Sequence, residues 1–136
     1  MTALDAARKR LAFLLETVTL EAEHLRVTDQ RLFTERFTPE RAATLRADVA
    51  LAEQLDAFGA RFARLQDMAG DKLLPALLSG LGERVGSVLD NPDRAARLGL
   101  LAEASDTWVA AWALRHCTVH EINRVTGTVT WRGRPR

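Results

Sequence analysis

The sequence predicts an all-α fold, an up-and-down bundle of four main helices that is followed by a non-helical basic tail. The chain of 136 residues is 47% hydrophobic, which suits a single domain with a real core. Ala, Leu, Arg and Glu dominate the composition, and these side chains lose little freedom in a helix. Apolar residues also recur at helical spacing. We therefore expect the bundle over residues 1–122 and the tail over 123–136.

A first helix is predicted over about residues 3–28, and its pattern can extend toward Phe33. Thr2 precedes this helix and Asp5 follows three residues later, which is the pattern of a capping box. The apolar residues of this stretch recur every three or four positions, as on one face of a helix: Leu4, Leu11, Leu14, Leu15, Val18 and Leu25.

A second, long helix is predicted to begin at Thr38-Pro39-Glu40. This triplet offers a Thr cap, a Pro at the first helical position and an acid in the first turn. Gly70 and Pro75 should kink or interrupt the helix, and Gly80 and Gly82 should end it. Its apolar face is formed by Leu45, Val49, Leu51, Leu55, Phe58, Phe62, Leu65, Met68 and Leu73.

Two further helices and the tail complete the expected order. Residues 83–91 read as a loop, and Asn91-Pro92-Asp93 repeats the cap-then-Pro pattern and opens a short helix that Gly99 closes. Ser105-Asp106 caps a last helix that continues through Ile122. In the tail, residues 125–131 alternate with a β-like period, and no acid opposes the basic residues Arg124, Arg132, Arg134 and Arg136.

Charge and cysteine content limit the classes of function. The net charge of +1 gives no strong attraction of the whole molecule to nucleic acid, so any anion binding must come from a local cluster. Cys117 is the one cysteine, which excludes an intrachain disulfide and suits a reducing compartment. No stretch has the length of a signal peptide's apolar run or of a membrane span. We expect a soluble, cytoplasmic protein with no membrane partner.

The stretch from Arg115 to His120 is the part of the sequence that best fits chemistry. His116 and His120 are four residues apart and would share one face of a helix. Arg115 would lie about 140° around the axis from His120, so it either bends toward the same opening or meets His120 of a second copy. An imidazole can move the proton of a ribose 2′-hydroxyl, and a guanidinium clamps a phosphate. The set suits RNA cleavage without a metal or another cofactor.

Ordinary explanations of the same residues remain open. The motif can be an exposed Arg beside a hydrogen-bonded His. The i, i+4 spacing of the two histidines also occurs in zinc sites, but a third ligand would have to be Cys117, Glu121 or the distant His24. Cys117 would point about 100° away from the preceding histidine, so we expect no metal there. A small buried thiol is the better interpretation of Cys117 than a nucleophile.

Several aromatic and basic residues allow two interpretations each. Trp108 and Trp112 suit the core or a dimer interface better than base stacking, and Trp131 suits a frayed tail better than a stacked base.

Arg61, Arg64 and Lys72 fall along one long helix and could line an RNA groove. The ordinary alternative is solvated charge paired with Asp67 and Asp71 on the same helix.

The Arg-(four residues)-His spacing near the end of an all-α domain resembles the signature of the HEPN superfamily, with His116 at the polar position that follows the Arg. Further stretches are similar to HepT-like toxins and related nucleotidyltransferase-partner proteins. The resemblance covers about residues 38–121 and rests on residues 61–67, 72–75, 95–100, 105–108 and 114–121.

The resemblance implies a homodimer with a cleft built from both copies of the motif, and a metal-independent endoribonuclease activity on RNA. It implies a minimal nucleotidyltransferase antitoxin as partner. Arg115 and His120 would be catalytic, and His116 would contact RNA. The chain departs from the family at Ile122, where relatives often have a Tyr, and in residues 125–136, where relatives continue into another helix. These departures favour a second hypothesis, a non-catalytic subunit that assists a nucleotidyltransferase; a helical scaffold without a nucleotide role is the third.

Overall fold

The computed structural model describes residues 2–87, 89–101, 110 and 113, and this part of the chain is an all-α bundle. The helical-bundle fold predicted from the sequence is therefore confirmed. None of the helices in the described part is long and apolar enough to cross a bilayer. The elements are α1 (Ala3–Leu32), α2 (Pro39–Ala43), α3 (Val49–Asp67), the π-helix η1 (Met68–Leu73), α4 (Leu74–Gly80) and α5 (Asp90–Arg97).

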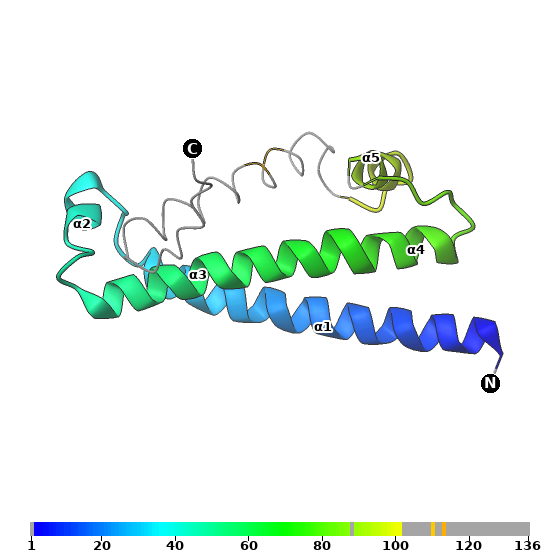
Figure 1. The fold of residues 1–136 in the computed structure, drawn as a ribbon, viewed down its shortest axis with the longest axis horizontal. Coiled ribbons are helices and arrows are strands. Elements are labelled where there is room, and N and C mark those ends of the chain that lie inside the picture. Colours follow the sequence, from blue (N-terminus) through cyan, green and yellow to red (C-terminus); the bar gives the residue numbers. More distant parts are fainter. Residues whose placement is uncertain (1, 88, 102–109, 111–112, 114–136) are drawn as a thin grey trace, which may run out of the picture.

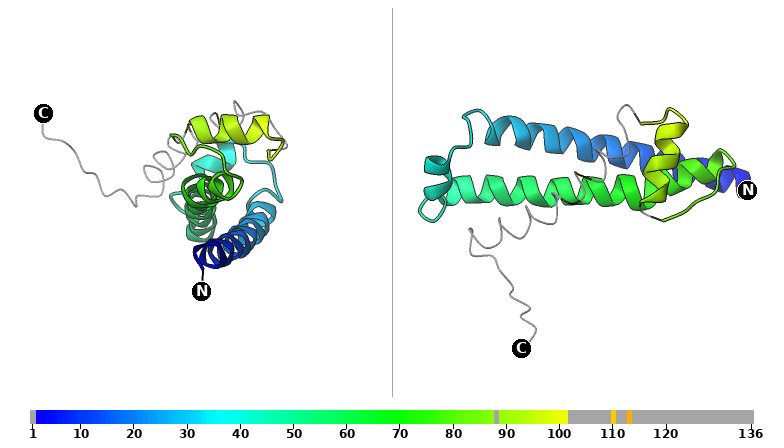
Figure 2. Two further views of the ribbon diagram at one scale, coloured as in Figure 1. Left: turned by 90° about the vertical axis from the view of Figure 1, so that its right-hand side faces the viewer. Right: turned by 90° about the horizontal axis from the view of Figure 1, so that it is seen from above.

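Two long rods lie side by side and form the body of the bundle (Figures 1 and 2). One rod is α1, and the other is the continuous run of α3, η1 and α4, which returns antiparallel to α1. The short α2 closes one end of the pair, and α5 crosses α4 at the other end. The predicted helix that continues through Ile122, the boundary at residue 122 and the basic tail lie outside the described residues.

The start of α1 agrees with the predicted capping box. The Asp5 amide donates to Thr2 Oγ1 at 3.1 Å, and the Thr2 amide donates back to Asp5 Oδ2 at 3.2 Å. The Thr2 hydroxyl also donates to Asp5 Oδ2 at 2.6 Å. This bond, together with that from the Thr2 amide, holds the pKa of Asp5 below its ordinary value. The helix continues to Leu32, so the extension toward Phe33 is also confirmed.

The prediction of one continuous helix from Thr38 was wrong, because the chain starts a helix twice. Thr38 does cap a helix, but α2 ends after five residues. A second cap follows at Asp48, whose Oδ1 accepts from the Leu51 amide at 3.0 Å and starts α3. The turn between the two starts buries Leu45 against Leu32 and Leu51, so core packing favours the break.

The predicted interruption near Gly70 and Pro75 is a π-helical segment, η1. A proline lacks an amide donor, and its ring crowds the carbonyl four residues earlier. Just before Pro75, the Leu74 amide donates to the Ala69 carbonyl five residues back, which widens the helix. The widened turn accommodates the proline ring, so the rod continues into α4 instead of breaking.

Of the three glycines predicted to end helices, Gly82 and Gly99 adopt the left-handed conformation that ends them, whereas Gly80 is the last residue of α4 and has no positive φ. Gly82 has φ +73° and Gly99 has φ +75°. The residue after each glycine donates its amide to a carbonyl five residues earlier, at 2.9 Å in both cases: Glu83 to Leu78, and Leu100 to Ala95. This is the Schellman arrangement, and it confirms the predicted ends of α4 and α5.

The prediction of Asn91 as the cap of α5 was wrong. The helix begins at Asp90, after Leu89, with no side-chain hydrogen bond at its cap. Ser87 and Asp90 bond reciprocally across this start: the Asp90 amide donates to Ser87 Oγ at 3.1 Å, and the Ser87 amide donates to Asp90 Oδ2 at 3.3 Å. Hydrogen bonding by the Ser87 side chain, and then by its amide, holds the pKa of Asp90 below its ordinary value. Since the helix starts at Asp90, Asn91 lies inside it, and its buried side chain accepts the Gly86 amide at 2.7 Å.

Apolar side chains gather in two clusters at opposite ends of the bundle. One cluster joins α1, α2 and α3: Leu32, Leu45 and Leu51 are buried, and Phe37, Ala52, Leu55 and Phe58 pack on them. The other joins α4 and α5: Leu74, Leu78 and Ala95, with Leu101 packed on them. Between these ends, the contact of α1 with α3 includes polar side chains, among them two of the predicted RNA-binding residues.

Candidate functional site

The predicted catalytic motif lies outside the residues that the structure describes. This applies to Arg115, His116 and His120, and equally to Trp108, Trp112, Cys117 and Trp131. The roles assigned to these residues stay predictions from the sequence. The described bundle reaches Leu101, which packs against the α4–α5 cluster ahead of the motif.

Arg61, predicted to bind RNA, anchors α3 to α1. Its Nη1 donates to Thr28 Oγ1 at 2.5 Å and to the His24 carbonyl at 3.0 Å. The Thr28 hydroxyl in turn donates to the same His24 carbonyl at 3.1 Å, and Thr28 is only 5% exposed. One guanidinium nitrogen therefore joins a side chain and a backbone carbonyl of the neighbouring helix. This amino group is committed to holding the rods together.

Arg64, the other predicted RNA-binding residue on α3, is more open to solvent. Its side chain is 57% exposed, and its Nη1 lies 3.7 Å from Oε2 of Glu21 on α1. Glu21 is only 16% exposed, and that oxygen is buried and accepts no hydrogen bond from the described residues. The ion pair thus places a cation beside a partly desolvated carboxylate, because the oxygen has lost water without gaining a donor.

We call this set the α1–α3 polar bridge: Glu21, His24 and Thr28 on α1, with Arg61 and Arg64 on α3. Arg61 and Arg64 are three positions apart, so they lie on neighbouring turns of one helix. The sequence alone offered Asp67 and Asp71 on the same helix as partners, whereas the structure adds partners on α1. Both residues have a structural role at the interface of the rods, and Arg64 keeps most of its side chain accessible to an anion.

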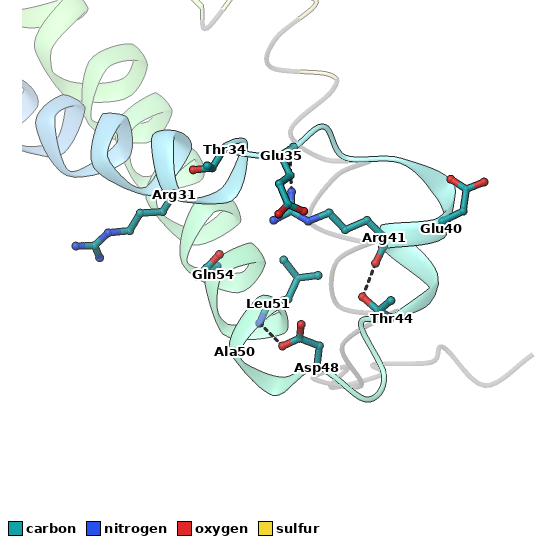
Figure 3. Close-up of a pocket in the computed structure, with 10 residues that line it drawn as sticks. All are labelled: Arg31, Thr34, Glu35, Glu40, Arg41, Thr44, Asp48, Ala50, Leu51 and Gln54. Atoms are coloured by element: carbon teal, nitrogen blue, oxygen red, sulfur yellow. Dashed lines mark hydrogen bonds between the residues drawn. The ribbon is translucent and has the colours of Figure 1, made fainter.

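An open hollow of about 640 Å³ lies where α1 ends and α2 and α3 begin. Figure 3 shows Arg41 reaching back from α2 toward the end of α1. Its Nη1 donates to the Leu32 carbonyl at 2.6 Å and to the Glu35 carbonyl at 2.8 Å, and its guanidinium lies 5.3 Å from the centre of the Phe37 ring. Arg41 therefore satisfies the carbonyl of Leu32, the last residue of α1, where a cation is favoured, and that of Glu35 in the connection that follows.

The charges around the hollow are of both signs, so it selects neither an anion nor a cation. Arg31 and Arg41 line it together with Glu35, Glu40 and Asp48. Two of these groups already make hydrogen bonds at helix ends: Arg41 donates to the Leu32 carbonyl at the end of α1, and Asp48 caps α3. The sequence pattern indicated a helix start at Thr38, but it gave no signal for this hollow, which depends on how three helices meet.

The zinc alternative rests on His116 and His120, which lie outside the described residues, so it stays untested. Within residues 2–87, 89–101, 110 and 113, no three His, Cys, Asp or Glu side chains gather to hold a metal ion. His24, the distant third ligand considered from the sequence, lies on the exposed surface of α1. In comparisons with known proteins, no family model, no curated protein and no solved structure matches this chain.

Proposed function

We propose that the chain is a HEPN-type toxin that cleaves RNA without a metal ion. The observation that carries this proposal is the Arg115-(four residues)-His120 motif, with His116 beside the Arg. In the proposed mechanism His120 is the general acid and base, Arg115 clamps the phosphate, and His116 makes a second polar contact.

The all-α frame ahead of the motif supports the proposal, because the resemblance expects helices in that place. Residues 61–75, which carry part of the resemblance, lie in α3, η1 and the first turn of α4. Residues 95–100 form the end of α5 and its closing turn. The framework by itself specifies no chemistry, so the activity rests on the motif.

The chemistry follows from the two kinds of side chain. A neutral imidazole removes the proton of a ribose 2′-hydroxyl, and the oxygen attacks the adjacent phosphorus. The bond from phosphorus to the 5′-oxygen then breaks, and an imidazolium supplies a proton to that leaving oxygen. The guanidinium offsets the negative charge that grows on the phosphate oxygens. The products are a 2′,3′-cyclic phosphate and a free 5′-hydroxyl, and no metal is needed at any step.

The proposal is tested by RNA cleavage in the presence of a chelator. His120→Ala should lower the cleavage rate by about 10²- to 10⁴-fold, the contribution typical of general acid–base catalysis. His24→Ala is the matched control, because it removes an exposed imidazole from α1 and should leave the rate unchanged. Equal cleavage by the wild type and the His120→Ala variant would refute the assignment.

The proposed partners are a second copy of the chain and a minimal nucleotidyltransferase that acts as antitoxin, in the cytoplasm. In the proposal, Arg61 and Arg64 also contact the RNA. Of these two, Arg64 is the better candidate because its side chain is more than half exposed. Arg64→Ala should weaken RNA binding at low salt and lower the salt dependence of the affinity.

A second candidate function keeps the fold and omits the cleavage. The chain would then be a non-catalytic subunit that binds a minimal nucleotidyltransferase and presents its substrate. Ile122 in place of the family's Tyr, and the altered terminus at residues 125–136, favour this alternative. Co-purification with such a partner, together with no RNA cleavage by the wild type, would support it over the nuclease.

A further inference from the structure

We draw no further inference here: the strongest candidate, the stripe of exposed apolar side chains that Phe13, Leu20 and Val27 form at seven-residue spacing along α1, carries no proposal because nothing in the structure shows what covers it.

Discussion

Replacing Arg61 by Ala should destabilise the protein by separating the two rods at their polar bridge. The substitution removes two hydrogen bonds from a charged donor, at 2.5 Å to Thr28 Oγ1 and 3.0 Å to the His24 carbonyl. A hydrogen bond to a charged group contributes about 1.5–3 kcal/mol. The His24 carbonyl keeps the Thr28 hydroxyl as a donor, so we count chiefly one bond. The expected loss in the free energy of unfolding is about 1.5–3 kcal/mol.

The assay is urea unfolding followed by circular dichroism, with linear extrapolation to water. A double-mutant cycle with Thr28→Val measures the coupling of Arg61 to the Thr28 side chain, because valine keeps the volume of the buried side chain and removes the hydroxyl. The hydroxyl also donates to the His24 carbonyl, so the expected coupling energy of about 1 kcal/mol covers the whole set of bonds among Arg61, Thr28 and His24. Arg64→Ala is the control for loss of a nearby cation, and it should show no coupling to Thr28→Val.

A loss below about 0.5 kcal/mol for Arg61→Ala, the range of ordinary surface substitutions, would refute the reasoning.

Three other predictions concern the loop, the caps and the proposed dimer. Gly86→Ala should destabilise the protein by about 1–3 kcal/mol, because the added Cβ would lie 2.9 Å from Asp90 Cβ. Gly80→Ala is the control and should not destabilise it, because a Cβ at that position would meet nothing within 4 Å. Equal unfolding midpoints for the two variants would contradict this prediction. Asp5 and Asp90 have lowered pKa values, so their stabilising effect is present above the ordinary pKa of 3.8 and is lost as the pH falls below it. The Asp90→Asn variant should therefore lose less thermal stability than the wild type between pH 5 and pH 3, and parallel losses would contradict the bonding of Ser87 to the Asp90 carboxylate. Co-expressed Arg115→Ala and His120→Ala chains should regain about a quarter of wild-type RNA cleavage if each site takes one residue from each copy, since half of the dimers would hold one intact site of two. No regain would exclude the site between copies.

The features that the sequence predicted well depend on residues close together in the chain. The cap at Thr2 needs only Asp5, and the helix ends at Gly82 and Gly99 need only the left-handed conformation that glycine tolerates. Such local signals can be recognised without knowledge of the packing. The interruption near Pro75 belongs to the same group, because a proline disturbs its own helix.

The features that sequence reasoning missed depend on competition or on distant contacts. The Asn91-Pro92-Asp93 pattern predicted a helix start two residues too late, because it did not reveal the reciprocal bonds between Ser87 and Asp90 at the observed start. The break before Asp48 depends on the burial of Leu45 between two rods. Arg61 is separated in the sequence from its two partners by 33 positions (Thr28) and by 37 positions (His24), so a pattern within one helix could not reveal these contacts.

The candidate site likewise has one part that the sequence predicts and another that depends on packing. The spacing of Arg115 and His120 is visible in the sequence, and it predicts a pair of groups suited to RNA. Whether they meet depends on tertiary or quaternary packing, which spacing alone does not specify. Arg61 and Arg64 illustrate the difference, because both fit a basic helix face in the sequence, yet their partners in the structure lie on α1.

The chemical identity of the RNA ends is the most direct test of the proposed nuclease. A defined oligoribonucleotide is incubated with each purified variant in excess chelator, and the fragments are analysed by mass spectrometry. The wild type and His24→Ala should leave 2′,3′-cyclic phosphate and 5′-hydroxyl ends, and His120→Ala should leave the RNA intact. Intact RNA with the wild type, or the same fragments from His120→Ala, would contradict the proposal.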